Sequence, residues 1–170
     1  MYAQDARPSL NRPESNSEWE SMREEFHILV GNLSETDLKR KTLDTRWSVG
    51  EILEHMVQSL ALIPQEIVSV RKGKDFMNLP ISIVGAGNWI LIKLRARHAT
   101  PQSLLARYDR AFTVAVQAWE NVREDEWAKG AHFYGEGYCT LANNLALAPS
   151  HFREHAGQIR KSLPCEERSR

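Results

Sequence analysis

Residues 47–67 read Trp47-Ser-Val-Gly-Glu-Ile-Leu-Glu-His-Met-Val-Gln-Ser-Leu-Ala-Leu-Ile-Pro-Gln-Glu-Ile67, and they carry the clearest helical pattern in the chain. The Ser48 hydroxyl can accept the amide hydrogen of Glu51, and the Glu51 carboxylate can reach back to the Ser48 amide, which makes a capping box. Apolar residues then recur three or four positions apart, at Val49, Ile52, Met56, Leu60, Ile63 and Ile67. The stretch therefore predicts an amphipathic helix that begins after Ser48, bends at Pro64 and ends near Gly73.

Three other segments show the same helical period, at about residues 17–30, 100–122 and 140–163. Ser17 is the predicted N-cap of the first of them. Thr100 and Pro101 begin the next, since a proline at the first helical position costs no hydrogen bond. The chain is therefore expected to form four long amphipathic helices.

A long connection, residues 73–99, separates the second of these helices from the third. A structureless loop of that length is uncommon in a compact domain, so residues 83–97 are expected to form a further short helix packed over one end of the bundle. No segment shows the strict alternation of a strand. The sequence thus predicts an all-α fold, a four-helix bundle with one long crossover between helices two and three.

A chain of 170 residues is long enough for one hydrophobic core. The predicted bundle occupies residues 17–164. Residues 1–16 are expected to form a flexible arm, because they are rich in proline, serine, asparagine and charge, and residues 165–170 a polar tail.

Charge and hydropathy exclude several classes of protein. Lys and Arg number 22 and Asp and Glu also number 22, so no basic surplus is available to neutralise phosphates, which argues against nucleic-acid binding. The most apolar stretch, residues 81–94, is interrupted by glycine, asparagine and lysine and is shorter than the roughly 18 apolar residues of a membrane span. The chain has only two cysteines, Cys139 and Cys165, and its first residues contain no apolar leader segment. The sequence therefore predicts a cytoplasmic protein.

Three histidines fall on the shoulders of two predicted helices. His55 lies about 110° from the centre of the apolar stripe of its helix, and His155 and His151 lie about 60° and 100° from that of theirs. Two imidazoles four residues apart on a helix can converge on one ion, and three histidines with open positions are typical of catalytic zinc sites. A hydrogen-bonded boundary histidine is the alternative for His55. Pro149 predicts a kink or a restart at Ser150, directly before His151.

The sequence contains other possible metal ligands, but none of them belongs to a complete metal-binding motif. Glu24 and His27 form half of the motif of di-iron carboxylate bundles, but such centres need a second copy of it. His98 and His132 fall in predicted loops and are expected to face solvent. Cys139 precedes a helix start, where the helix dipole can lower a thiol pKa, although plain burial is the simpler expectation.

Two elements together resemble the DinB/YfiT-like family of bacterial metal-binding four-helix bundles. The first is Trp47-Ser-Val-Gly-Glu-Ile-Leu-Glu-His55, and the second is His151-Phe-Arg-Glu-His155-Ala-Gly-Gln-Ile159. The resemblance implies that a divalent ion, commonly nickel, zinc or iron, is bound through His55, His151 and His155. Some members of that family are S-transferases or isomerases that depend on a low-molecular-weight thiol, and many have no known activity.

Two functions follow as hypotheses. The first is a metal-dependent enzyme, either a thiol-dependent S-transferase or a hydrolase, acting on an unknown small molecule. Gln158 is then expected to orient a ligand, while Glu154 and Glu51 are candidates for holding imidazole N–H groups, although Glu51 is better explained as a helix cap. The alternative is a non-catalytic metal-binding or self-associating protein, in which residues 89–92 serve as a homodimer surface or as a lid. Ordinary core packing is the simplest interpretation of that apolar cluster.

Overall fold

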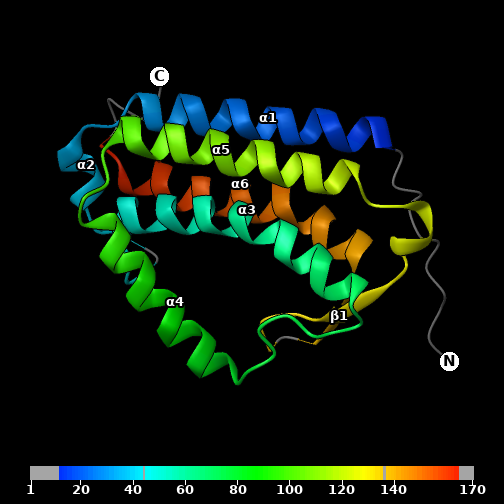
Figure 1. Cartoon of the computed structure of the whole chain (residues 1–170). Coiled ribbons are helices and arrows are strands. Elements are labelled where there is room, and N and C mark those ends of the chain that lie inside the picture. Colours follow the sequence, from blue (N-terminus) through cyan, green and yellow to red (C-terminus); the bar gives the residue numbers. More distant parts are fainter. Residues whose placement is uncertain (1–11, 44, 136, 165–170) are drawn as a thin grey trace, which may run out of the picture.

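The structure, a computed structural model, describes residues 12–164 except 44 and 136, with the side chains of residues 12–16 and 81 left out. Four long helices form a bundle (Figure 1). They are α1 (Arg12–Gly31), α3 (Val49–Arg71), α5 (Pro101–Glu120) and α6 (Leu141–Ser162). The predicted all-α four-helix bundle is confirmed.

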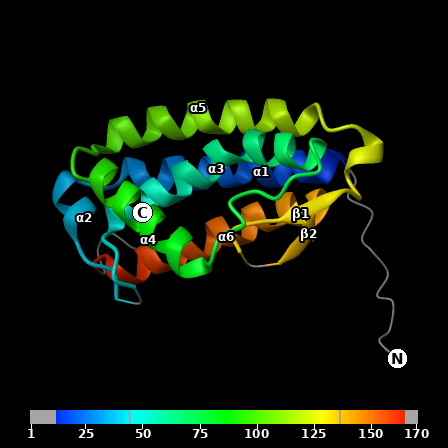
Figure 2. The ribbon, with the colours of Figure 1, turned by 60° about the horizontal axis from the view of Figure 1, so that its bottom comes forward.

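The crossover contains a fifth long helix, α4 (Ile81–Ala96). In the bundle, α5 packs against α1 and α3, and α6 packs against the other sides of α3 and α1. Because α4 carries the chain back along the bundle, α3 and α5 run in the same direction (Figures 1 and 2). The long connection between helices two and three of the bundle is therefore the element that sets the topology.

Aromatic side chains from three helices meet in the core. The rings of Phe26 on α1 and Tyr108 on α5 stack with their centroids 3.7 Å apart. Phe152 on α6 contacts both of them, at 6.4 Å from Phe26 and 6.5 Å from Tyr108. All three side chains are buried. The apolar stripes of the sequence therefore face one another as their period predicts.

Side-chain caps define where the helices begin. The Ser48 hydroxyl accepts from the Glu51 amide at 3.3 Å, and the Glu51 carboxylate accepts from the Ser48 amide at 2.7 Å, which confirms the predicted capping box. Thr100 caps α5 in the same way, with Pro101 as its first residue. Thr140 caps α6.

Some predicted boundaries are wrong. Helix α1 begins at Arg12, so Ser17 lies inside it rather than at its N-cap, and residues 12–16 belong to the helix instead of the predicted arm. Of the kink or restart predicted at Ser150, the restart does not occur, because helix α6 continues through Pro149. Residues 1–11 of the arm and the tail 165–170, with Cys165, lie outside the described residues.

Four short elements were not predicted. They are α2 (Glu35–Lys39), the 3₁₀ turn η1 (Glu124–Glu126), and strands β1 (Gly130–His132) and β2 (Tyr138–Thr140), which pair antiparallel. Helix α2 lies close to the first turn of α3, where a Cβ at Gly50 would be 3.0 Å from the Leu38 carbonyl oxygen. The glycine therefore permits the close approach of the two helices.

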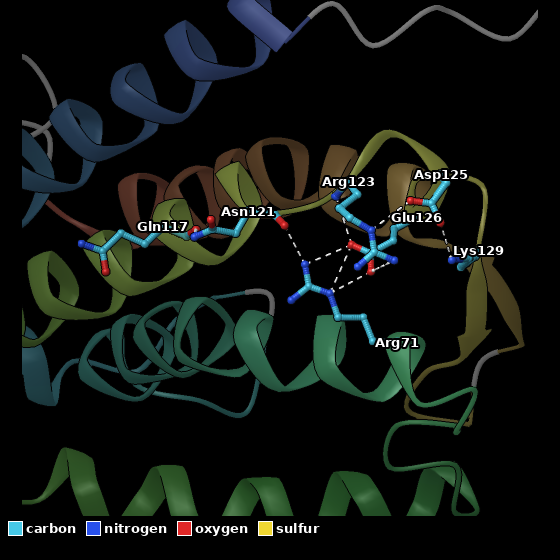
Figure 3. Close-up of polar contacts among 7 residues, drawn as sticks. All are labelled: Arg71, Gln117, Asn121, Arg123, Asp125, Glu126 and Lys129. Atoms are coloured by element: carbon cyan, nitrogen blue, oxygen red, sulfur yellow. Dashed lines mark hydrogen bonds and ion pairs between the residues drawn. The ribbon is translucent and has the colours of Figure 1, made fainter.

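Buried carboxylates hold the hairpin end of the bundle. Glu126 accepts from Arg71 Nε at 3.0 Å and from the Arg123 amide at 3.0 Å, and Arg71 also donates to the Asn121 carbonyl at 2.7 Å (Figure 3). On α3, Glu66 accepts from the Tyr134 hydroxyl and, at 2.8 Å, from the Asn144 amide. These contacts join α3 to the chain on both sides of the hairpin.

The crossover helix is mostly exposed. Trp89, Ile90 and Leu91 are all exposed, and Ile92 alone of residues 89–92 is buried, at 1% exposure. Ordinary core packing is therefore the wrong interpretation for the first three. Helix α4 contacts α3 but diverges from the bundle toward its N-terminal end (Figure 1). No helix in the described part of the chain is long and apolar enough to cross a membrane.

Candidate metal centre

Three imidazoles meet between α3 and α6. His55 comes from α3, and His151 and His155 come from adjacent turns of α6. One ring nitrogen from each lies within 4.8 Å of the other two. The Nε2 atoms of His55 and His151 are 3.1 Å apart. The predicted convergence of the three histidines is therefore present in the fold.

His155 presents an unpaired nitrogen to this cluster. Its Nδ1 lies 2.8 Å from the Gln158 side-chain oxygen, which accepts the Nδ1 hydrogen and leaves the lone pair on Nε2. The Nε2 atom is buried and has no hydrogen-bond partner among the described residues. A buried nitrogen without a partner is costly, and a coordinated ion would satisfy it.

The electrostatics favour the neutral form of two of these imidazoles, those of His55 and His151. Burial is the largest cause that lowers the pKa of His55 to about 3, and the charges of His155 and His151 contribute to the same shift. Burial also lowers the pKa of His151, with the Glu154 carboxylate opposing the shift. Neutral imidazoles are the form that binds metal ions.

The spacing of the nitrogens fits a small divalent ion. Metal–nitrogen bonds of about 2.0–2.1 Å in tetrahedral geometry place two ligand nitrogens about 3.3 Å apart. The 3.1 Å between the Nε2 atoms of His55 and His151 is close to that value. Three such ligands leave a coordination position open to water or a substrate.

A tight loop before α3 holds Trp47 against the cluster. The Thr42 amide and hydroxyl both donate to the Trp47 carbonyl, at 3.0 and 2.9 Å. The Trp47 ring then meets His55 edge to face, with centroids 5.1 Å apart. Helical spacing does not predict this role of Trp47, because its contact with His55 depends on the loop closing back on the helix.

The predicted supporting residues differ in what they do. Gln158 contacts His155 as described above. Glu51 caps α3, which confirms the simpler of its two interpretations. Glu154 is exposed and affects the cluster through its charge on His151.

The remaining histidines lie elsewhere. His27 pairs with Asp109 at 2.9 Å, and His132, which lies in strand β1 rather than a loop, pairs with Asp75 at 3.0 Å. His98 is exposed, as expected. Within the described residues, no second group of three or more metal-binding side chains was found. Burial raises the pKa of Cys139, so the helix dipole does not activate its thiol.

Fold and site together define a four-helix bundle with one crossover and a three-histidine cluster between two of its helices. A profile of the DinB superfamily matches residues 18–159, and the chain belongs to that superfamily. A search of curated proteins gave no significant match.

A solved structure of a mycothiol-dependent maleylpyruvate isomerase has a similar fold, with a TM-score of 0.71 at 11% sequence identity. The alignment covers 94% of this chain and 66% of that longer chain.

Proposed function

We propose that His55, His151 and His155 bind one divalent metal ion, of nickel, zinc or iron, and that the protein is a metal-dependent enzyme acting through a low-molecular-weight thiol or water. The observation that carries the proposal is the buried Nε2 of His155, which has no partner among the described residues and belongs to a set of ring nitrogens within 4.8 Å of one another. The described residues alone leave this nitrogen unsatisfied.

A bound divalent ion with three neutral ligands would favour loss of a proton from a thiol or water beside it. The residues of the chain prepare the site for that chemistry. Gln158 holds the His155 tautomer that presents Nε2, and burial keeps His55 unprotonated at neutral pH. The edge-to-face contact of Trp47 with His55 excludes water from one side of that ring.

The relatives support a thiol-dependent transferase or isomerase over a hydrolase. The chain belongs to the DinB superfamily, and the protein with the similar fold is described as mycothiol-dependent. Since that protein is longer and only 11% identical, its substrate is not carried over.

Elemental analysis of protein purified without a metal-affinity tag tests the proposal. Wild-type protein should contain close to one divalent ion per chain, and His55→Ala and His155→Ala should lose it. His98→Ala is the matched control, because it removes an exposed imidazole outside the cluster. Folded wild-type protein that takes up no nickel, zinc or iron would contradict the proposal.

A metal-loaded enzyme should then catalyse transfer of a thiol to an electrophile, which can be assayed with bacillithiol, mycothiol and glutathione. Equal activity in metal-free protein would show that the histidine cluster does not carry the reaction.

The exposed apolar residues of α4 favour a second candidate, a self-associating metal-binding protein without catalysis. Ile83, Ile90 and Leu94 are 57%, 53% and 51% exposed. Water that exchanges on the bound metal distinguishes the candidates, since a catalytic site keeps an open position and a structural site is closed.

A further inference from the structure

A cavity of about 350 Å³ lies between the start of α3 and the crossover helix. Its walls come from the loop before α3, the first turn of α3 and the C-terminal half of α4. The lining residues are Lys41, Arg46, Trp47, Glu51, Trp89 and Lys93. A cavity of this size suits a small ligand.

The cavity carries an excess of positive charge. Among the described lining residues, three cationic side chains face a single carboxylate, that of Glu51. This carboxylate already accepts from the Ser48 amide at 2.7 Å and lies 3.6 Å from the Lys41 ammonium. The negative charge of Glu51 is therefore already balanced by the Lys41 ammonium and the Ser48 amide.

Two cations remain to bind a ligand. Neither Arg46 nor Lys93 has a carboxylate within ion-pair distance among the described residues, which leave out position 44. The Lys93 ammonium lies over the Trp89 ring, 4.5 Å from its centroid. Arg46 and Lys93 come from separate segments, so a bound anion would connect the loop to α4.

The cavity adjoins the histidine cluster through Trp47. This side chain lines the cavity, and its ring also contacts His55, with centroids 5.1 Å apart. Glu51 lies one helical turn before His55 on α3. A molecule held in the cavity therefore lies beside the candidate metal centre.

We propose that this cavity binds the carboxylate group of a small molecule, with Arg46 and Lys93 as its cationic partners and the two indoles against the flat or apolar part. The guanidinium fork matches a carboxylate, and indole faces pack on planar groups. A reaction of the bound molecule at the histidines rests on the proposed function. Binding of a carboxylate in the cavity does not depend on it.

Benzoate and benzamide have nearly the same shape, but only benzoate is charged. Calorimetric titration with both therefore tests whether the cavity prefers an anion. Benzoate should bind at least about tenfold more tightly than benzamide, and high salt should weaken it. Arg46→Gln and Lys93→Gln should each weaken benzoate binding by about tenfold without changing benzamide binding.

Arg95→Gln is the matched control, since it removes one positive charge from the same helix at a residue that does not line the cavity. Equal binding of benzoate and benzamide, no binding of benzoate, or an equal loss in Arg95→Gln would overturn the proposal. Quenching of indole emission by benzoate, reduced in Trp89→Leu because Trp47 remains, would place the ligand in the cavity.

The same titration in His155→Ala separates this inference from the proposed function. Benzoate binding that persists in a protein without metal supports the cavity site, whatever the metal analysis gives. Benzoate binding that disappears together with the metal, and is unchanged in Lys93→Gln, would mean that benzoate binds the ion and not the cavity.

The carboxylate has two chemical sources, the thiol or the other substrate. N-acetylcysteine and its amide, titrated into metal-loaded protein, distinguish them. A preference for the acid that Lys93→Gln removes assigns the cavity to the thiol, whereas a preference restricted to benzoate assigns it to the other substrate.

Discussion

Gln158 acts on the cluster through one hydrogen bond, the 2.8 Å contact between its side-chain oxygen and His155 Nδ1. Hydrogen bonds of this kind orient a ligating imidazole and fix its tautomer, and their loss typically costs about 10–100-fold in metal affinity. We therefore expect Gln158→Leu to weaken zinc binding by that factor, measured by competition with a chromophoric chelator. Gln158→Glu keeps an acceptor and should retain most of the zinc affinity. A zinc affinity of Gln158→Leu equal to that of the wild type would show that Gln158 does not support His155.

His55 makes the metal-free protein sensitive to mild acid. Its pKa is lowered from 6.5 to about 3 in the folded state, mainly by burial, so the unfolded chain binds a proton that the folded chain rejects. Stability is therefore complete above pH 6.5 and falls as the pH drops toward 3. Between pH 8 and pH 5 the contribution of His55 amounts to at most about 2 kcal/mol.

The urea-unfolding free energy of metal-free wild type should therefore lose up to this amount more than that of His55→Gln over the same interval. His98→Gln, outside the cluster, is the control. Parallel pH profiles of wild type and His55→Gln would show that His55 is not desolvated.

At the scale of single residues, the sequence predicted the positions of His151 and His155 from helical spacing, but the role of Gln158 differs from the prediction. It was expected to orient a ligand, and it instead accepts from the His155 imidazole, a role predicted for Glu154 or Glu51. His151, His155 and Gln158 share one helix, so their mutual positions follow from its geometry. The cavity beside them could not be predicted. Arg46 and Lys93 line it from segments that only tertiary packing brings together.

Within α3, Glu54 lies next to His55 but forms a buried ion pair with another helix. The Glu54 carboxylate is 1% exposed and accepts from both terminal guanidinium nitrogens of Arg107 on α5, from Nη1 at 2.8 Å. Removing one partner of a buried ion pair leaves the other charge uncompensated. Because the Arg107 side chain is 37% exposed, we expect Glu54→Ala to cost about 3 kcal/mol, the low end for such pairs.

Chemical denaturation measures this loss, and the double variant Glu54→Leu/Arg107→Met should recover most of it, because apolar replacement of both partners is often tolerated. If Glu54→Ala lowers the free energy of unfolding no more than the loss of an exposed ion pair does, the pair between Glu54 and Arg107 does not act as a buried ion pair.

Long helices with local signals were predicted, whereas short elements were missed even where, as in α2, a local signal is present. The starts of α3 and α5 follow from capping boxes formed within four residues. The Ser34 capping box of α2 carries the same kind of signal and was overlooked. The strands are three residues each and are held by tertiary contacts such as that between Glu66 and Tyr134, which no local period reveals. At Pro149 a local signal overstated the effect: the restart does not occur, since α6 continues through a residue that disfavours helix interiors.

For the whole molecule, α4 is the element whose sequence does not match its surroundings. An apolar helix normally packs into a core, yet much of α4 faces solvent. Ile83, Gly87, Ile90 and Leu94 lie within an arc of about 60° on one side of the helix. Antiparallel pairing of this stripe with a second copy places Ile83 opposite Leu94 and the small Gly87 opposite Ile90.

Charge favours the same arrangement. Helix α4 has basic residues, Lys93 and Arg95, in its last turn and no acidic residue in its first. Parallel pairing would bring the two basic ends together, whereas antiparallel pairing in this register separates the two Lys93 residues by about 14 Å along the axis and the two Arg95 residues by about 20 Å. A second copy in antiparallel orientation is thus the partner that the stripe and the charges both fit.

We therefore expect a homodimer in sedimentation equilibrium, with Ile90→Glu raising its dissociation constant at least tenfold, because the variant buries an unpaired charge opposite Gly87. Val114→Glu is the matched control: it places the same charge on an exposed apolar position of α5, away from the stripe, and should leave association unchanged. Metal content should be the same in both variants, since neither residue contacts the histidine cluster. A wild-type protein that stays monomeric at all concentrations, or an equal effect of both substitutions, would mean that the stripe on α4 does not bind a second copy of the chain.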